Sequence, residues 1–249
     1  MSQGQQFVID INADLGEGIG PDPLIMPWIS SCNIACGGHA GDFETIRETI
    51  LLAKQHGVAV GAHPSFPDRD NFGRVILQMS KEDLTASIFE QILAFSAICE
   101  ELEVEFHHLK LHGALYNYAA RDAATSDAVI KALELTGLRP ILYLPFNSVL
   151  HRKAENLFPL CFEAFIDRRY EADGSLRARK YPDAIIHDPQ SAWEQLSQMI
   201  MSGRLTTING EVISLKASTY CLHSDHPNSL QIIQYIRNQM EVHQISLAK

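Results

Sequence analysis

The chain has 249 residues, of which 46% are hydrophobic and 20% charged, a composition typical of a folded globular protein. Its net charge is −10 and its lysines and arginines are scattered, so there is no basic stripe to bind nucleic acid. No apolar run approaches the roughly 18 residues of a membrane span, and the start MSQGQQ lacks the features of a signal peptide. We therefore expect a cytoplasmic protein that binds neither nucleic acid nor membrane.

Short apolar runs alternate with segments of helical periodicity along the chain. Strands are predicted near residues 7–13, 29–36, 58–63, 106–111, 140–145, 160–167 and 218–223, and residues 184–186 could add another. Helices are predicted over residues 42–57, 80–102, 125–137, 191–203 and 227–240. Asp42 and Ser80 are suitable N-caps, and Gly57 is a suitable residue to end a helix. The Asn209-Gly210 step predicts a hairpin within residues 205–215.

The alternation of strand and helix predicts parallel strands joined by crossover helices. Most predicted strands end at ionisable residues, and only a closed barrel brings all these ends to one face. An open doubly wound sheet would concentrate its polar residues at one switch point, so the spread favours a parallel β/α barrel. We find no linker and no internal repeat, and we expect one domain over residues 1–249.

Five cysteines form no CxxC pair, which argues against a disulfide framework and against a cysteine zinc site. Four of them lie in apolar runs typical of buried, unreactive positions. For Cys36, which opens the glycine-rich segment CGGHAGD, both a packing role and a functional role remain open.

The segment NADLGE places Asn12 and Asp14 on one face of a strand, with Glu17 just beyond. Two carboxylates and an amide at a strand end can hold a divalent cation or act as acid and base. The alternative is that Asp14 caps the following turn and that Glu17 is solvated.

The segment NIACGGHAGD allows close backbone approach to a ligand, beside His39 as a candidate ligand or proton carrier and Asp42 as a helix cap. It is not a phosphate-binding loop, because no Gly-Lys-Ser/Thr ending is present, and no GxGxxG fingerprint occurs either. In GAHPSFPDRDNFGR, His63 lies at a strand end and Arg74 suits a substrate carboxylate. Alternatively, Arg74 pairs with Asp68 or Asp70.

The segment KLHGALYN places Lys110 and His112 on one face, where the lysine can stabilise an oxyanion. Gly113 is expected to end this strand, and Asn117 is a candidate donor to substrate. Two further histidines earlier in the run are interpreted as packing or surface residues; they are His107 and His108.

In the run FEAFIDRRY, Glu163 and Asp167 lie on the same face of the predicted strand. Burying these acids is energetically unfavourable unless they are paired or functional. A salt-bridge network with Arg168 and Arg179 is the structural alternative. The last strand ends in CLHSD, whose acid could orient its histidine. These two residues are His223 and Asp225.

These motifs, in this order and spacing and over essentially the whole chain, resemble the LamB/YcsF family. The resemblance implies a seven-stranded β/α barrel of the glycoside hydrolase/deacetylase type. It also implies a role in the ATP-dependent opening of 5-oxo-L-proline to L-glutamate, together with two partner subunits, B and C. The family motif residues here are Asp14, Glu17, Asn33, His39, Asp42, His63, Asp68, Arg74, Lys110, His112, Asn117, Glu163, Asp167, Arg168, Arg179, His223 and Asp225.

Three positions depart from the family pattern: Gly38 replaces a Phe, Leu111 a Pro and Ser224 a Gly. The last matters most, because a glycine there can use a positive φ that serine rarely adopts.

We expect His63 or His112 to act as general base for water, oriented by Asp14 or Asp167, with Lys110 stabilising the oxyanion. Substrate would be bound by the remaining candidates, which are Asn33, His39, Arg74, Asn117, Glu163, Arg168, Arg179, His223 and Asp225. ATP, as its magnesium complex, would be bound largely by the partner subunits, since the chain lacks a phosphate-binding loop.

Two other functions are consistent with the sequence. One is a stand-alone metal-dependent deacetylase or amidohydrolase whose divalent ion is held by Asp14, His39 and His63, although no HExxH-like spacing is present. The other is a non-catalytic subunit that binds 5-oxoproline and delivers it to its partners.

Overall fold

The computed structural model describes residues 7–248, so the segment MSQGQQ, from which no signal peptide is expected, lies outside the described residues. Within them, seven parallel strands close into a barrel, because the last of these strands pairs with both the sixth and the first. In order around the barrel they are β1 (Phe7–Leu15), β2 (Ser31–Ala35), β3 (Ala59–His63), β4 (Phe106–Lys110), β5 (Ile141–Leu144), β6 (Leu160–Phe165) and β9 (Thr219–His223). The predicted parallel barrel of seven strands is confirmed.

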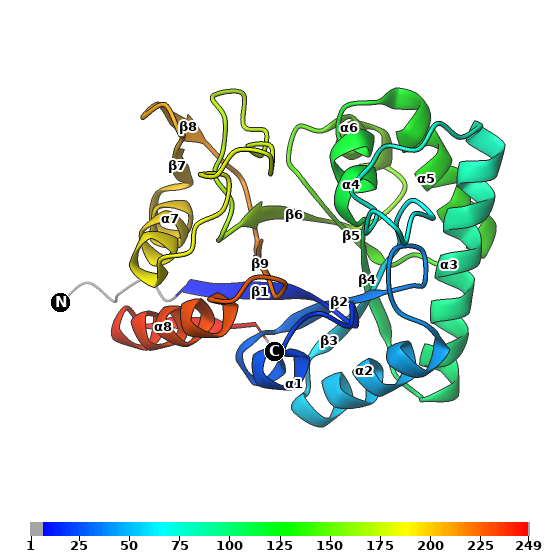
Figure 1. Cartoon of the computed structure of the whole chain (residues 1–249), viewed down its shortest axis with the longest axis horizontal. Coiled ribbons are helices and arrows are strands. Elements are labelled where there is room, and N and C mark those ends of the chain that lie inside the picture. Colours follow the sequence, from blue (N-terminus) through cyan, green and yellow to red (C-terminus); the bar gives the residue numbers. More distant parts are fainter. Residues whose placement is uncertain (1–6, 249) are drawn as a thin grey trace.

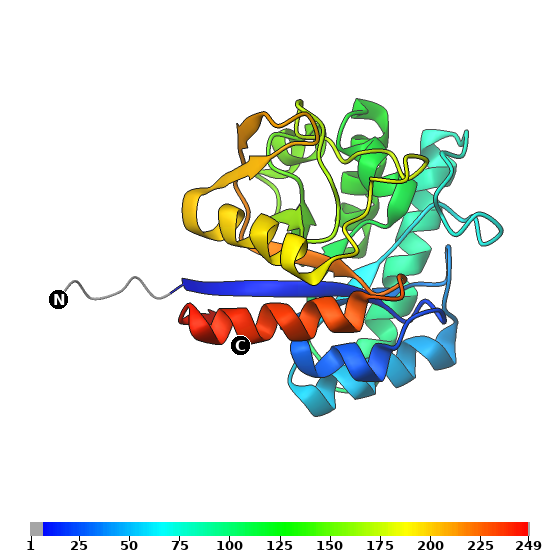
Figure 2. The ribbon, with the colours of Figure 1, turned by 60° about the vertical axis from the view of Figure 1, so that its left-hand side comes forward.

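The five predicted helices lie outside these strands (Figure 1). They are α2 (Phe43–His56), α3 (Lys81–Glu101), α5 (Ala123–Thr136), α7 (Pro189–Ser202) and α8 (Ser229–Val242). Their caps explain their limits: the Asp42 carboxylate accepts from the Thr45 amide, and Gly57 ends α2 at a φ of 65°. In two views, α7 and α8 lie against each other beside β1 (Figures 1 and 2).

The hairpin predicted at Asn209-Gly210 is confirmed as the antiparallel pair β7 (Arg204–Thr206) and β8 (Val212–Ser214). The possible strand at 184–186 is wrong: Ile185 forms only an isolated antiparallel bridge with Arg168. The apolar character of this segment goes with burial, since Ala184 and Ile186 are both buried within the loop between β6 and α7.

Several short elements were not predicted, because they span too few residues to show a period. They are α1 (Asp22–Ile25), the 3-10 helix η1 (Met26–Trp28), α4 (Gly113–Ala119), α6 (Val149–Ala154) and β10 (Ile245–Leu247). Gly113, expected to end a strand, instead begins α4. The strand β10 extends the sheet beside residues 7–9 of β1. Among the described residues, no helix is long and apolar enough to cross a bilayer.

The inside of the barrel is polar, whereas the layer between strands and helices is apolar. His108 was interpreted as either a packing or a surface residue. It is buried in this interior, so the packing role is the one found. Its Nε2 lies 2.9 Å from Asn33 Oδ1, and its ring stacks on Tyr143. Gly61 of β3 leaves room for it, since a Cβ there would lie 2.2 Å from His108 Nε2. Polar interior side chains therefore position the residues above them.

Candidate functional site at the mouth of the barrel

A cavity of about 720 Å³ opens where the strands end. Most of the predicted site residues line it, namely Asp14, His63, Arg74, Lys110, His112, Asn117, Glu163, Arg168, Arg179, His223 and Asp225. Glu17 lines it as well. Three predicted residues do not line it: Asn33, His39 and Asp167 lie behind the residues that do. The barrel thus assembles one pocket from distant segments, as the repeated ionisable strand ends predicted.

Lys110 is the fully buried cation of this pocket. Its Nζ lies 2.8 Å from Asp14 Oδ1 and 3.0 Å from Glu163 Oε1, and it donates to Cys221 Sγ at 3.0 Å. Burial opposes the charged amine, but the nearby Asp14 and Glu163 carboxylates outweigh it and raise the pKa of Lys110 well above its usual range. The lysine therefore remains charged, with two acids as its counterions.

Asp14 is held as a carboxylate by its neighbours. Although burial raises its pKa, the interactions with His63 and Lys110 outweigh this and leave the pKa of Asp14 well below the usual range. Asn33 donates to Asp14 Oδ1 at 2.9 Å and to Asn12 Oδ1 at 2.7 Å. Asn12 and Asp14 thus share a face, as expected. Asn33 therefore positions Asp14 through this hydrogen bond and does not itself line the cavity.

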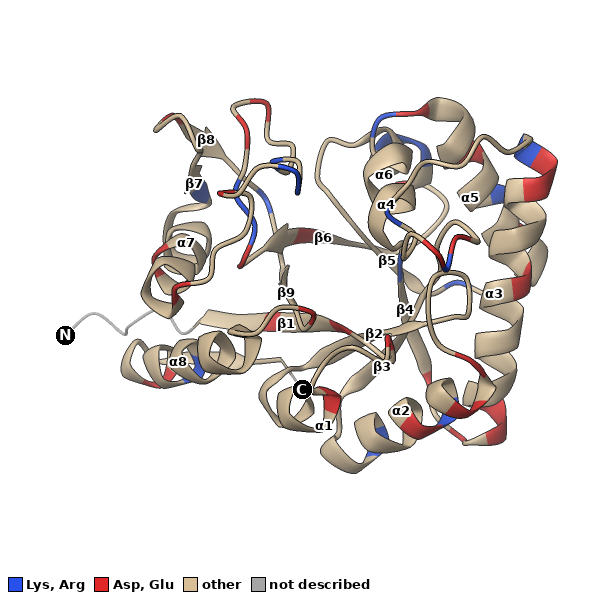
Figure 3. Cartoon of the chain, in the orientation of Figure 1, with Lys and Arg blue, Asp and Glu red and all other residues tan. Residues whose placement is uncertain are grey.

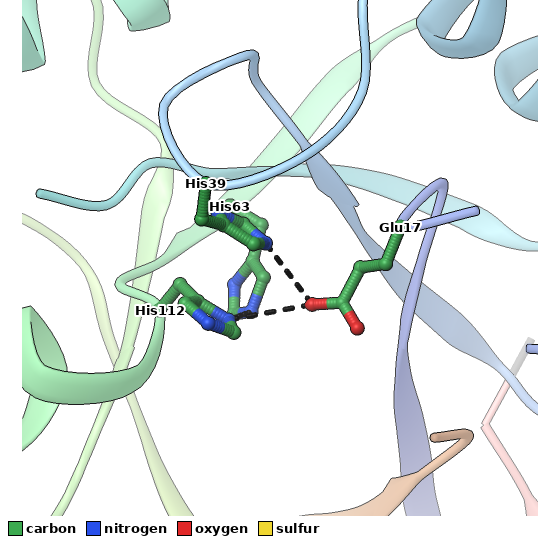
Figure 4. A group of neighbouring side chains, drawn as sticks. All are labelled: Glu17, His39, His63 and His112. Carbon is green, nitrogen blue, oxygen red and sulfur yellow. Dashed lines mark hydrogen bonds and ion pairs between the residues drawn. The ribbon is translucent and has the colours of Figure 1, made fainter. Parts of the chain in front are cut away.

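Four side chains form a compact group that we call the histidine cluster: Glu17, His39, His63 and His112 (Figure 4). Glu17 Oε1 lies 3.0 Å from His39 Nε2 and 3.3 Å from His112 Nδ1, and His63 Nε2 lies 3.0 Å from His112 Nδ1. Glu17, His39 and His112 follow β1, β2 and β4, and His63 is the last residue of β3, so four neighbouring strands build the cluster.

Burial and mutual repulsion keep His39 and His112 neutral. Burial, with the nearby His63, lowers the pKa of His39 to about 2, and burial with His39 lowers the pKa of His112 well below its usual range. Burial, together with the Asp14 charge, raises the pKa of Glu17 well above its usual range.

The metal triad expected from the sequence, Asp14 with His39 and His63, is not the arrangement found. Glu17 and His112 take the place of Asp14 beside the two histidines. Asp14 Oδ1 is instead bound by Lys110 and Asn33, while its Oδ2 remains 3.4 Å from His63 Nε2. A second potential ligand group comprises Asp14, Cys221 and His223.

His223 is oriented by Asp167 and not by Asp225, which corrects the expected pairing. Its Nδ1 lies 3.0 Å from Asp167 Oδ1, and its amide donates to Asp167 Oδ2 at 3.1 Å. His226 Nε2 lies 3.3 Å from the same carboxylate. Burial raises the pKa of Asp167, but its interactions with His223 and His226 outweigh this and leave the pKa far below its usual range.

Arginines line the cavity from the loop after β3 and from the loop between β6 and α7. In Figure 3 the loop between β6 and α7 carries several blue segments, which mark lysines and arginines. Asp225 pairs with Arg74 and lies 3.5 Å from Arg179. The alternative pairing of Arg74 with Asp68 or Asp70 is therefore wrong. Arg168 donates to the Arg177 carbonyl at 2.7 Å, and burial with the nearby Arg179 lowers its pKa to about 10. The expected salt-bridge network of Arg168 and Arg179 with Glu163 and Asp167 is not formed.

Several motif residues have structural roles. Asp42 caps α2, Asp68 accepts from Asn71, and the exposed Asn117 donates to the Gly113 carbonyl while lining the cavity. Cys36 is buried, its Sγ accepts from the His63 amide, and burial raises the pKa of its thiol, so the packing role holds.

Ser224 fits without the positive φ that a glycine would allow, and its hydroxyl donates to the Asp14 carbonyl at 2.7 Å. Gly38, by contrast, has no space for a side chain, since a Cβ would lie 2.5 Å from Gln91 Oε1. Both departures from the family pattern are therefore accommodated by local packing.

Among the contributors that the sequence did not predict is the Phe72 carbonyl, which lies 2.9 Å from His112 Nε2. Every residue has a backbone carbonyl, so residue type does not show which carbonyl will contact a functional side chain. The only signal was the neighbouring Gly73, which adopts a φ of 61° and packs against His112 and His39.

Comparison with known proteins agrees with this architecture. The family model described as LamB/YcsF family matches residues 9–249. The chain is 42% identical to the 5-oxoprolinase A-subunit of Symbiobacterium thermophilum, over 96% of this chain and 94% of that protein. It is 43% identical to the 5-oxoprolinase A-subunit of Chloroflexus aggregans, over 94% and 95% of the two chains.

Solved structures give the same result. The lactam utilization protein of Thermus thermophilus superposes with a TM-score of 0.90 at 35% identity, covering 97% of this chain and 99% of that one. A family 4 carbohydrate esterase of Streptomyces lividans, 10% identical over 99% of this chain and 93% of its own, shares the fold alone with a TM-score of 0.52. From the match over nearly its whole length, the chain belongs to the LamB/YcsF family.

Proposed function

We propose that this chain is the subunit of an ATP-dependent 5-oxoprolinase that binds 5-oxo-L-proline and opens its lactam to L-glutamate. The observation that carries the proposal is the pocket in which a charged lysine, two histidines of the histidine cluster and several arginines face one cavity. The names of the relatives, lactam utilization protein and 5-oxoprolinase A-subunit, support the same substrate class.

ATP is needed because a five-membered lactam is a stable amide. Phosphorylation of its carbonyl oxygen creates a better electrophile that water can open, with ADP and phosphate as the other products. The sequence has no phosphate-binding loop, so we propose that two partner subunits, B and C, supply most of the site for magnesium-ATP.

The pocket offers a group for each requirement of hydrolysis. Arg168, which lines the cavity and forms no ion pair with Glu163 or Asp167, suits the substrate carboxylate. Lys110 suits the developing oxyanion, and His63 or His112, with Asp14 Oδ2 3.4 Å from His63 Nε2, suits the activation of water. Arg74 is a second candidate for binding the substrate carboxylate, which would then compete with Asp225 for the Arg74 guanidinium.

The division of labour is tested by measuring ATP hydrolysis by the purified chain with and without 5-oxoproline. We expect no 5-oxoproline-dependent turnover until both partners are added. Robust turnover by the chain alone would reject the proposed location of the ATP site.

Substrate binding is tested by calorimetry with 5-oxo-L-proline. We expect Arg168→Gln to weaken binding by about tenfold or more, because a bidentate charged contact is lost. Arg47→Gln, on the outer face of α2, is the matched control and should bind normally. A purely non-catalytic binding subunit predicts instead that complexes carrying His63→Asn or His112→Asn keep normal turnover.

A further inference from the structure

The outward nitrogens of two cluster histidines are fixed by backbone carbonyls. His63 Nδ1 lies 2.8 Å from the Lys110 carbonyl oxygen, and His112 Nε2 lies 2.9 Å from the Phe72 carbonyl oxygen. A carbonyl oxygen only accepts, so each of these nitrogens carries the ring proton. In the neutral rings, the lone pairs therefore belong to His63 Nε2 and His112 Nδ1.

These two lone-pair nitrogens face each other at 3.0 Å. Two acceptors at this distance repel unless a positive species lies between or beside them. Carboxylates adjoin both nitrogens, with Glu17 Oε1 3.3 Å from His112 Nδ1 and Asp14 Oδ2 3.4 Å from His63 Nε2. The arrangement therefore concentrates electron pairs and negative charge at one point.

Two of the three separations between the candidate ligand atoms are close to what an ion would need. A tetrahedral ion with bonds of roughly 2.0–2.1 Å holds its ligand atoms about 3.4 Å apart, and the observed separations are 3.0 Å and 3.3 Å. His63, His112 and Glu17 all line the cavity, so a fourth position would open towards substrate. Three protein ligands with one open position are typical of a catalytic metal site.

His39 is placed differently from the other members of the histidine cluster. Its ring is parallel to that of His112, with an angle of 3° and centroids 3.6 Å apart, so the in-plane lone pairs of the two rings cannot converge on one ion. His39 does not line the cavity, and its Nε2 lies 3.0 Å from Glu17 Oε1. It therefore orients Glu17.

The loop after β3 supports this arrangement from outside. Phe72 and Gly73 adopt positive φ values of 55° and 61°, which aim the Phe72 carbonyl at His112 Nε2. A Cβ at Gly73 would lie 2.9 Å from His112 Cδ2 and from His39 Cβ. Carbonyls that hold the far nitrogen of each histidine are typical of metal-binding imidazoles.

We propose that His63 Nε2, His112 Nδ1 and the Glu17 carboxylate bind one divalent transition-metal ion, with Asp14 adding negative charge beside it. Two imidazoles and a carboxylate suit zinc and its first-row neighbours and do not suit magnesium or calcium. Such an ion would polarise a carbonyl or activate water, and this role alone rests on the proposed lactam hydrolysis. The binding site itself does not depend on that function.

The test is calorimetric titration of zinc chloride into the full chain after dialysis against a chelator, without substrate or partners. We expect one zinc ion per chain. His63→Ala and His112→Ala should weaken binding by on the order of 100-fold or more, since even an outer-shell partner is worth 10–100-fold. Glu17→Gln, which keeps the side-chain shape, should weaken it by at least about tenfold if either alanine variant fails to fold.

Two further variants act as controls. His39→Gln should keep one ion per chain with affinity reduced by about 10–100-fold, as for a residue that orients a ligand. His243→Gln removes an exposed histidine at the end of α8 and should leave binding unchanged. Loss of binding in His39→Gln with normal binding in His112→Ala would overturn the proposed ligand set.

Two other results would also overturn it. One is no zinc binding, which would mean that a shared proton alone separates the two nitrogens. The other is binding that survives every cluster variant, which would mean an adventitious ion only. Lactam hydrolysis by the reconstituted complex is scored separately: a metal-free complex with full activity would reject the catalytic role of the ion but neither its binding site nor the proposed function, and a metal-binding chain in an inactive complex would reject the function but not the binding site.

Discussion

Lys110 is the residue on which the interior of the pocket depends. It neutralises Asp14 and Glu163, both buried, so its removal leaves two acids uncompensated. We expect Lys110→Met to lower the free energy of unfolding by about 3–5 kcal/mol in urea denaturation at pH 7. Lys153→Met, which breaks a half-exposed pair with Asp127, should change it by less than about 1 kcal/mol. Equal effects of the two substitutions would contradict the network described here.

The Asp167 carboxylate predicts a pH dependence of stability. Its folded pKa is depressed below the unfolded value of about 3.9, so its contribution is present above that value and is lost as the pH falls through the acid range. We expect Asp167→Asn to be less stable than the parent by about 1–3 kcal/mol at pH 6, because charge-assisted hydrogen bonds are lost. The difference should shrink below about pH 4. Thermal unfolding at both pH values checks this, and a pH-independent gap would speak against it.

At this scale the sequence predicted which residues meet but not how they pair. Lys110, His112 and Asp14 were recognised because they end strands, and a barrel brings such ends together. The partner of His223 could not be predicted, because Asp167 and Asp225 are both acids at strand ends and only the closed barrel selects between them. The contact made by the Phe72 carbonyl could not be predicted for a different reason. Every residue has a backbone carbonyl, so residue type does not indicate which one will contact a side chain.

Among the elements, α2 shows how a motif residue can be structural. Asp42 belongs to the conspicuous segment NIACGGHAGD, yet its carboxylate accepts from the Thr45 amide and caps the helix. We expect Asp42→Ala to lower the melting temperature by about 2–4 °C, as loss of a cap does in a chain of this size. Lactam hydrolysis by the complex should be unaffected.

The matched variant Asp42→Ser retains a cap and should restore the melting temperature. If Asp42→Ala abolished turnover while leaving the melting temperature unchanged, Asp42 would belong to the site and not to the helix end.

Long helices with caps were predictable because their signals are local, as Asp42 and Gly57 at the two ends of α2 illustrate. The short helix α4 was not, since Gly113 resembles the end of a strand and only the packing of the Gly73 carbonyl against it determines its conformation. Similarly, β10 has three residues and exists because residues 7–9 of β1 offer a free edge.

On the scale of the whole molecule, the first and last strands of the barrel, β1 and β9, pair with each other and so close it. Truncation after Ser202 removes β9 and leaves β1 and β6 with unpaired edges, so we expect no cooperative thermal transition and aggregation of the product. Truncation after Gln244 removes β10, which pairs only with residues 7–9, and should leave a folded barrel that melts a few degrees lower.

Circular dichroism during heating checks both truncations. A cooperative transition in the shorter chain would contradict a single closed domain, which the sequence predicted from the absence of any linker. The closed barrel could be predicted because ionisable residues are spread over many strand ends. By contrast, no sequence signal distinguishes β10 from an irregular segment.

We propose that the cavity at the mouth of this barrel opens the lactam ring. The most direct test of this proposal is the formation of glutamate and ADP from 5-oxo-L-proline and ATP by the reconstituted three-subunit complex. The chain would be intact, substituted His112→Asn, substituted His243→Gln as a surface control, or omitted. We expect coupled products with the intact and His243→Gln chains and loss of glutamate with His112→Asn or without the chain. Near-normal glutamate formation by a folded His112→Asn complex, or by the partners alone, would contradict the account.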